Sequence, residues 1–267
     1  MDLNMDKSTP VVWITGASSG IGAELARQYS KRNVNLIISA RRTEILLQIK
    51  ESCKGDFKIE ILPFDINDFD SAAYQVEKAL SLFGRVDILI NNAGISQRSL
   101  ILDSDFKVFK KLIEIDYLGT VALSRAILPY FVSQQSGHYV VVSSVMGKFG
   151  SPYRSGYCAA KHALHGFFDV LRMEHLKDNI FISMICPGFV ATPIALNSIQ
   201  GDGTPFGKDD QATRKGLNVI YFARKMIQAI DQKKWEVYIG RKEKLGVFLK
   251  RLSNKLLHNI VIRSRVR

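Results

Sequence analysis

The sequence is poor in cysteine, and the few that it has are not arranged as a scaffold. Its 267 residues include 3 cysteines, Cys53, Cys158 and Cys186, which are odd in number and form no CxxC pair. A disulfide-stapled fold would need paired cysteines, so we expect a protein of a reducing compartment.

Long hydrophobic runs and a leader segment are also missing. No run of 18 apolar residues occurs, so we expect no membrane-spanning helix. The first ten residues, MDLNMDKSTP, hold no basic stretch followed by an apolar one, so we expect no export signal. A composition with 46% hydrophobic and 23% charged residues excludes a disordered chain. We therefore expect a cytoplasmic protein with one core, a single domain over residues 1–267.

The positive charge is concentrated near the end of the chain. Of the formal net charge of +12, residues 233–267 carry 11 basic and 2 acidic residues, a net +9. The basic extension, residues 241–267, includes a stretch (244–260) with apolar side chains at helical spacing, namely Leu245, Phe248, Leu252, Leu256 and Ile260. A basic amphipathic helix can lie on an anionic membrane surface, cover a neighbouring subunit or close over the substrate, and it can equally dock on its own domain. Nucleic-acid binding is not expected, because no aromatic stacking platform accompanies the charge.

Short β-rich runs alternate with longer amphipathic stretches along most of the chain. We expect strands at Val11–Thr15, Val34–Ser39, Ile59–Pro63, Val86–Asn91, Tyr139–Ser143, Ile180–Cys186 and Val237–Ile239. We expect helices at Gly20–Arg32, Glu44–Ser52, Asp68–Phe83, Asp105–Val132, Gly156–Leu176 and Thr213–Asp231. Near-continuous Val/Ile/Leu runs are typical of parallel strands covered on both faces, and strand–helix repetition predicts right-handed crossovers. The predicted fold is α/β, a single Rossmann-like, doubly wound, parallel seven-stranded sheet with helices on both faces. The two longest helices also favour a homodimer or homotetramer.

Residues 193–215 interrupt this regularity. The segment holds three glycines, two prolines and few periodic apolar positions, and it follows the sixth expected strand. Open α/β sheets bind ligands at the carboxyl ends of their strands, so we expect a substrate loop here. A plain surface excursion fits the same composition.

A glycine-rich turn follows the first expected strand. In TGASSGIG, the glycines Gly16, Gly20 and Gly22 lie between a strand and a helix, where backbone can approach a diphosphate and free N–H groups can bind it. The spacing is not the GxGxxG of the dinucleotide fingerprint, so this turn alone is weak support.

The second expected strand ends in basic residues instead of an acid. A carboxylate at this place reads a ribose 2′-hydroxyl, whereas an arginine accommodates a 2′-phosphate. No acid lies between Val34 and Arg42, and Arg41 and Arg42 are adjacent. Because a guanidinium fork suits a phosphate dianion, we expect NADP(H) over NAD(H).

A tyrosine and a lysine lie four residues apart, at helical spacing, after the fifth expected strand. Tyr157 and Lys161 are four residues apart and share a helix face, and Ser144 follows the strand itself. A nearby cation favours a phenolate, so we expect Lys161 to lower the pKa of Tyr157 from about 10 toward neutrality. Tyr157 would then serve as a general acid or base.

Taken in order, TGASSGIG, NNAG at residues 91–94, Ser144, YCAAK at 157–161 and PGFVAT at 187–192 resemble the short-chain dehydrogenase/reductase family. The resemblance covers residues 10–240 and is strongest to the hydroxysteroid-dehydrogenase-like and carbonyl-reductase-like branches. It implies that Tyr157 exchanges a proton with the substrate oxygen, that Ser144 hydrogen-bonds that oxygen, and that Lys161 holds the nicotinamide ribose. It implies cofactor contacts from Gly16, Ser18, Ser19, Gly20, Ile21, Arg41, Arg42, Asp65, Asn92, Ala93, Gly94, Tyr157, Lys161, Pro187, Gly188, Val190 and Thr192.

One position departs from the family pattern. Asp116 stands where the family usually has an asparagine that holds a water near the catalytic lysine. An aspartate still accepts hydrogen bonds from water, which favours a tolerated substitution, but a close pairing with Lys161 would raise the pKa of Tyr157. The sequence thus predicts an NADP(H)-dependent oxidoreductase acting on a small-molecule carbonyl or alcohol, with a catalytically weak nucleotide-binding regulatory or scaffold protein as the alternative. No metal site is expected, because Cys158, His162 and His165 share a helix face without a visible fourth ligand.

Overall fold

The computed structural model describes residues 9–208 and 210–264. Residues 1–8, on which the expectation about an export signal rests, and residues 265–267 of the basic extension lie outside the described residues.

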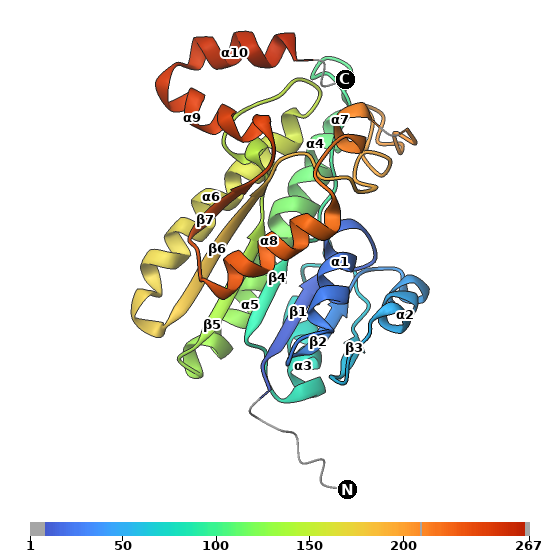
Figure 1. Ribbon diagram of the computed structural model, residues 1–267, viewed down its shortest axis with the longest axis vertical. Helices are drawn as coiled ribbons and strands as arrows, with labels where there is room; N and C mark the ends of the chain where they lie inside the picture. The colour runs from blue at the N-terminus through green and yellow to red at the C-terminus, as the bar shows by residue number, and fades with distance from the viewer. Residues whose placement is uncertain (1–8, 209, 265–267) are drawn as a thin grey trace, which may run out of the picture.

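A seven-stranded parallel sheet forms the centre of the molecule, as the sequence predicts (Figure 1). Its strands are β1 (Val11–Thr15), β2 (Asn35–Ser39), β3 (Ile59–Ile61), β4 (Ile88–Asn91), β5 (Gly137–Val142), β6 (Ile180–Pro187) and β7 (Glu236–Ile239). The strand order is β3-β2-β1-β4-β5-β6-β7, so the chain reverses direction across the sheet between β1 and β4. Ligands bind outside the carboxyl ends of the strands at such a reversal, and the candidate site lies there.

Helices cover both faces of the sheet. They are α1 (Gly20–Tyr29), α2 (Thr43–Ser52), α3 (Ala72–Phe83), α4 (Phe106–Ile113), α5 (Gly119–Ser133), α6 (Ser155–Glu174), α7 (Gln211–Arg214), α8 (Val219–Asp231), α9 (Leu245–Leu252) and α10 (Asn254–Arg263). Buried side chains of α1, α2 and α8 form one core cluster, and those of α3, α5 and α6 form a second. Strands β1 and β5 are buried at every position, because parallel strands between two helical layers have no solvated face.

The longest expected helix and the terminal helical stretch both differ from the prediction. The stretch predicted as one helix over Asp105–Val132 contains a π-helical turn, Glu114–Leu118, between α4 and α5. The extra residue in such a turn changes the direction of the side chains around it, and Asp116 lies within it. The terminal stretch over 244–260 is two helices, because Ser253 is extended and its hydroxyl accepts a hydrogen bond from the Leu256 amide at 3.2 Å, which starts α10.

The substrate loop has more structure than its composition suggests. It contains the short helix α7, and isolated bridges pair Gln97 with Ile199 and Val190 with Leu217. The structure also divides the predicted helix over Thr213–Asp231 into α7, a turn and α8. The loop is held against the carboxyl ends of the sheet.

Helices α9 and α10 lie beyond the carboxyl ends of the strands, above α6 in the view of Figure 1. Their inner side packs through Val247 and Leu257 against a third cluster that includes Met146, Phe149 and Tyr157. Among the described residues, no helix combines the length and the hydrophobicity needed to cross a bilayer.

Candidate active site

A cavity of about 550 Å³ opens at the carboxyl ends of the strands. Its lining includes the predicted residues Gly16, Ser18, Ser19, Gly20, Ile21, Arg41, Arg42, Asp65, Asn92, Ala93, Gly94, Ser144, Tyr157, Lys161, Pro187, Gly188, Val190 and Thr192. The remaining predicted residue, Asp116, lies behind this lining and is fully buried. One cavity thus brings together residues as far apart in the chain as Thr15 and Thr213.

The glycine-rich turn has the backbone that a bound diphosphate requires. Gly16 and Gly20 have φ values of +64° and +54°, a region that other residues rarely adopt. A Cβ on Gly22 would lie 2.4 Å from the Gly16 carbonyl oxygen, so only glycine allows α1 to start this close to the turn. Since α1 begins at Gly20, its free N–H groups face the cavity beside the turn.

Asn92 lines the cavity, and its side chain also holds the glycine-rich turn, while its contact with a cofactor stays a prediction. Its side-chain amide donates to the carbonyl oxygens of Thr15 at 2.9 Å and Gly16 at 3.2 Å, and its backbone N–H donates to the Thr15 hydroxyl at 3.0 Å. The Asn92 side chain therefore fixes the glycine-rich turn from below.

Two arginines stand at the other end of the cavity. Arg42 donates from Nη2 to the Ser18 hydroxyl at 3.1 Å, which brings its guanidinium next to the glycine-rich turn. Arg41 forms a long ion pair with Asp65, 3.9 Å between Nη1 and Oδ2, and its side chain is 67% exposed. Both guanidiniums border the cavity and can reorient toward an anionic group.

Ser144, Tyr157 and Lys161 meet on the cavity wall. Ser144 follows β5, and its hydroxyl accepts from the Met146 amide at 3.1 Å; the same hydroxyl acts to lower the pKa of the Tyr157 phenol. Lys161 lies one turn after Tyr157 on α6, with its Nζ 5.7 Å from the centre of the phenol ring. Tyr157 and Lys161 share one face of α6, as their spacing predicts, and all three side chains are buried.

The expectation that Lys161 lowers the pKa of Tyr157 is wrong for the protein alone. The pKa of Tyr157 is raised, chiefly because burial disfavours the phenolate and next because the Asp116 carboxylate repels it. The hydrogen bond from Ser144 opposes this shift without overcoming it.

Asp116 accounts for part of that result. Its Oδ1 accepts a hydrogen bond from the Ile95 amide at 2.7 Å, and its Oδ2 lies 3.8 Å from Lys161 Nζ. Burial raises the pKa of Asp116 to about 6, although the Lys161 charge and the Ile95 amide both act to lower it. Lys161 itself donates to the Val142 carbonyl at 3.1 Å. The lysine charge is thus shared with a buried carboxylate that the usual asparagine would not supply.

Sequence reasoning missed a residue that positions the catalytic helix. The side chain of Gln97 is fully buried, and its Oε1 accepts from the amides of Gly156 at 2.8 Å and Tyr157 at 3.4 Å. These amides belong to the first turn of α6, which has no intrahelical partners for them. Gln97 lies three residues after Gly94, and nothing in the local sequence marks it as a cap.

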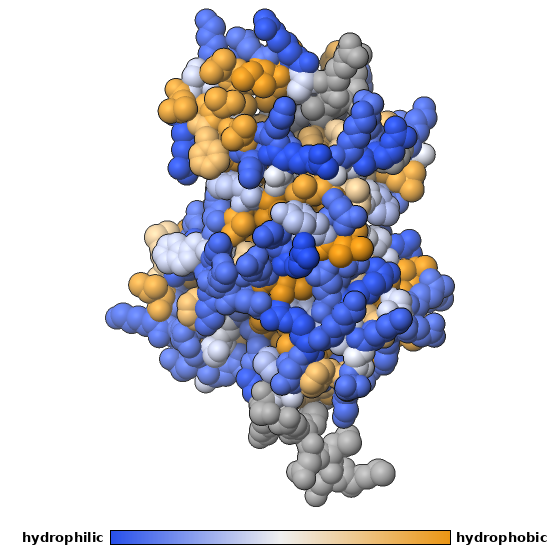
Figure 2. Space-filling view, in the orientation of Figure 1, coloured by the Kyte–Doolittle hydropathy of each residue, from blue (hydrophilic) through white to orange (hydrophobic). Residues whose placement is uncertain are grey.

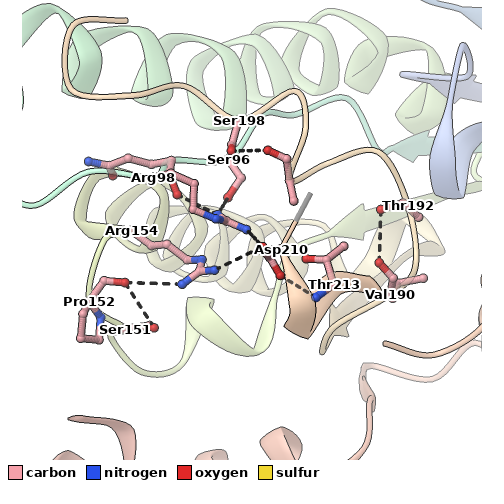
Figure 3. Close-up of polar contacts among 12 residues, drawn as sticks. Ser96, Arg98, Ser151, Pro152, Arg154, Val190, Thr192, Ser198, Asp210 and Thr213 are labelled. Atoms are coloured by element: carbon pink, nitrogen blue, oxygen red, sulfur yellow. Dashed lines mark hydrogen bonds and ion pairs between the residues drawn. The ribbon is translucent and has the colours of Figure 1, made fainter. Parts of the chain in front are cut away.

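A second missed group lies on the substrate side of the cavity. Arg98, Arg154 and Asp210 come from three separate segments and meet in one buried cluster (Figure 3). Both arginines line the same cavity as Tyr157.

Cys158, His162 and His165, the helix residues that could bind zinc, do not converge on one point. His162 Nδ1 donates to the Cys158 carbonyl at 2.7 Å, whereas His165 Nε2 lies 3.0 Å from the Ser143 hydroxyl. Within residues 9–208 and 210–264, no group of three or more His, Cys, Asp or Glu side chains is placed to hold a metal ion.

Comparison with known proteins defines the class to which this fold and site belong. Residues 10–202 match the family described as short chain dehydrogenase. The chain belongs to the short-chain dehydrogenase/reductase family, whose oxidoreductases have a fold that binds a nicotinamide cofactor.

Two curated relatives are similar over long stretches. Human dehydrogenase/reductase SDR family member 7 is 48% identical over 200 residues, which cover 73% of this chain and 59% of that protein. The Drosophila melanogaster dehydrogenase/reductase SDR family protein 7-like is 36% identical over 263 residues, 96% of this chain and 81% of the relative. The matched part therefore spans less than two thirds of the human protein but four fifths of the fly protein.

Solved structures show the same fold at lower identity. A short chain dehydrogenase/reductase from Burkholderia phymatum in complex with NAD has a TM-score of 0.82 at 21% identity, and covers 92% of this chain and 94% of its own. Levodione reductase has a TM-score of 0.79 at 25% identity, with coverage of 89% and 98%. The fold is thus shared over nearly the whole chain.

Proposed function

We propose that this protein is an NADP(H)-dependent oxidoreductase that interconverts a carbonyl and an alcohol. The observation that carries the proposal is the meeting of Ser144, Tyr157 and Lys161 on the wall of the cavity that also contains the glycine-rich turn. The cavity is lined at one place by Arg42, where the dinucleotide would bind, and at another by Arg154, where the substrate would bind.

The protein's own residues supply the proton and the orientation. When bound, a nicotinamide dinucleotide supplies or accepts the hydride. Tyr157 donates its phenolic proton to the carbonyl oxygen in reduction and accepts the hydroxyl proton in oxidation. Ser144 donates a hydrogen bond to the same oxygen and stabilises the negative charge that develops there.

The raised pKa of Tyr157 bears on the favoured direction. A phenol that holds its proton is ready to donate it at neutral pH, whereas oxidation needs the phenolate. The test of the proposal is to follow NADPH absorbance with a panel of ketones and aldehydes near pH 7. Consumption of NADPH that depends on the carbonyl supports the proposal, and tight binding without turnover on any carbonyl contradicts it.

The preference for NADP(H) has its own test. Replacing Arg41 by alanine removes one guanidinium from the cavity rim, and a charge-assisted contact of this kind contributes about 1.5–3 kcal/mol. We expect Arg41→Ala to weaken NADPH binding by roughly tenfold to a hundredfold and NADH binding by less than about threefold. Titration of both cofactors by protein fluorescence measures the two constants.

A matched control is Arg32→Ala, which removes an exposed arginine that pairs with Asp231 and does not line the cavity. This variant should bind both cofactors as the wild type does. An Arg41→Ala protein that loses NADPH and NADH affinity equally would show that Arg41 does not read the 2′-phosphate.

A second candidate function rests on Asp116. Its carboxylate draws on the charge of Lys161 and raises the pKa of Tyr157, which favours a nucleotide-binding protein with weak chemistry. Such a regulatory or scaffold protein would bind NADPH through the same turn and leave carbonyl compounds unchanged. Substitution of Asp116 by asparagine separates the two functions.

The terminal helices support a further proposal about partners. Outer side chains of α9 and α10 are apolar and exposed: Leu245, Phe248, Leu252, Leu256, Ile260 and Ile262. Figure 2 shows hydrophobic side chains gathered at this end of the molecule among hydrophilic ones. We propose that this surface docks on an anionic bilayer, because the net charge of the extension would repel a second copy of the same surface.

The homodimer or homotetramer expected from the two longest helices stays a prediction.

Co-sedimentation with vesicles tests this surface. We expect binding to phosphatidylserine-containing vesicles that weakens with salt, and little binding to phosphatidylcholine alone. The double substitution Leu252→Gln and Ile260→Gln should reduce binding by about tenfold, since each buried apolar side chain contributes about 1.5–3 kcal/mol at most. The control Leu47→Gln, an exposed apolar residue on α2, should bind as the wild type does. Equal sedimentation of the double variant and the control would rule the surface out.

A further inference from the structure

Two buried arginines flank one carboxylate beside the substrate end of the cavity. Arg98 and Asp210 form a hydrogen-bonded ion pair between Nη2 and Oδ2, and the same Oδ2 lies 3.9 Å from Arg154 Nη2. The exposed fractions of these side chains are 6%, 3% and 2% for Arg98, Asp210 and Arg154. In Figure 3 both guanidiniums point at the carboxylate. Because charges buried to this degree interact strongly, the cluster affects the ionisation of neighbouring titratable side chains.

Asp210 belongs to the substrate loop and is fixed there. Its Oδ1 accepts from the Thr213 amide at 2.6 Å and so starts α7. Burial acts to raise the pKa of Asp210, but the hydrogen bonds from Arg98 and from the Thr213 amide outweigh it and hold that pKa below its usual value. The carboxylate is therefore an anion at every pH at which the enzyme would work.

Arg154 belongs to the catalytic helix. It is the residue directly before α6, its carbonyl accepts from the Cys158 amide at 2.8 Å, and Tyr157 follows it by three residues. Burial and the neighbouring Arg98 charge lower the pKa of Arg154 to about 10, which still leaves it a cation at neutral pH. Arg154 and Tyr157 line the same cavity.

The groups around Tyr157 divide by sign. Asp116, from the π-helical turn, and the Cys158 thiol act against the phenolate, whereas the Ser144 hydroxyl and the Arg154 guanidinium favour it. Lys161 is the other cation nearby, and it lies 3.8 Å from Asp116. Arg154 is thus a second cation near the phenol, and its charge is paired with Asp210 and not with Asp116.

We propose that Arg154 is a positioning residue that favours the ionised form of Tyr157, and that Asp210 of the substrate loop sets how much of its charge acts on the phenol. The inference rests on the proposed role of Tyr157 as the general acid or base. It adds that the substrate loop is coupled electrostatically to the catalytic helix through this one carboxylate.

The proposal predicts opposite effects for two conservative substitutions. Asp210→Asn keeps an oxygen for the Thr213 amide, puts an amide nitrogen where Oδ2 accepted from Arg98, and removes the negative charge, so the phenolate becomes more favourable. Arg154→Gln removes the positive charge and makes the phenolate less favourable. We expect the pH midpoint of kcat/KM for NADP⁺-dependent alcohol oxidation to fall in the first variant and to rise in the second, each by roughly half a unit or more. Arg154→Lys keeps the charge and should restore a midpoint near that of the wild type.

Two exposed residues of the same loop region provide matched controls. Asp202→Asn and Arg214→Gln make the same changes of charge where side chains are exposed to solvent. Screening by water should leave the midpoint of both controls within about 0.2 units of the wild type. Thermal melts of all variants confirm that each is folded under the assay conditions.

A second measurement does not depend on turnover. In the NADP⁺ complex, tyrosine labelled with ¹³C at the ζ carbon reports the ionisation of Tyr157, and the signal is identified by its loss in Tyr157→Phe. The same opposite displacements of the Tyr157 titration are expected. Equal losses of activity with unmoved midpoints, or displacements in the same direction, would overturn the inference while leaving the role of Tyr157 intact. Full activity of Tyr157→Phe would instead overturn the proposed function.

Discussion

Tyr157→Phe is expected to abolish nearly all carbonyl reduction while leaving NADPH binding and folding intact. The substitution removes only the phenolic oxygen of a side chain that lines the cavity together with Ser144. General acid–base catalysis typically contributes a factor of 10² to 10⁴, so kcat should fall by roughly that factor. The dissociation constant of NADPH should change by less than about threefold, because the glycine-rich turn and the arginines that would hold the dinucleotide are untouched. Initial rates of NADPH consumption and a fluorescence titration measure the two quantities.

Tyr153→Phe is the matched control. It makes the same chemical change four residues earlier in the chain, at a side chain that does not line the cavity. We expect its kcat to equal that of the wild type. Comparable turnover in Tyr157→Phe and Tyr153→Phe would remove the assigned acid and, with it, the proposed mechanism.

The meeting of the predicted site residues follows from the fold. The carboxyl ends of parallel strands share one edge of the sheet, so the segments that follow β1, β4, β5 and β6 must converge once the sheet is recognised. Near-continuous apolar runs such as VVWIT and HYVVV predict such a sheet without any knowledge of distant contacts. The glycine-rich turn, Ser144, Tyr157 and Lys161 were predictable for this reason.

The charge environment of the site was not predictable in the same way. Gln97 reaches Gly156 across 59 residues of sequence, and Arg98 reaches Asp210 across 112. Such contacts depend on how loops pack, and no periodicity or propensity encodes them. An aspartate in a glycine-rich loop is expected to be exposed to solvent, yet Asp210 is only 5% exposed. The position of Asp116 was recognised from the sequence, but its burial and its approach to Lys161 depend on a π-helical turn that no sequence rule places.

Asp116→Asn has the second large expected effect, and it changes stability as well as catalysis. The pKa of Asp116 is raised from its ordinary value to about 6, chiefly by burial. The folded state therefore holds this proton more tightly than the unfolded state does, and the free energy of unfolding falls as the pH rises from about 4 to about 6. Two pKa units correspond to roughly 3 kcal/mol, which the wild type has lost above this window. Asparagine keeps an oxygen for the Ile95 amide and carries no charge, so the variant should be more stable than the wild type by up to roughly 3 kcal/mol at pH 7.5 and by little at pH 4. Urea unfolding at the two pH values measures the difference.

The same substitution should change the pH dependence of catalysis. The Asp116 carboxylate raises the pKa of Tyr157, so its removal favours the phenolate and frees the charge of Lys161. We expect the midpoint for alcohol oxidation to move to lower pH by about one unit, which raises the rate near pH 7 by up to about tenfold. Glu114→Gln is the control, since Glu114 lies in the same π-helical turn but pairs with the exposed Lys110 and not with Lys161. A wild type that binds NADPH without turnover, together with an active Asp116→Asn, would favour the weak nucleotide-binding protein over the enzyme. Asparagine has nearly the shape of aspartate but no charge, so the substitution isolates the effect of the carboxylate charge. An unmoved midpoint in Asp116→Asn would therefore show that this charge has no part in the ionisation of Tyr157.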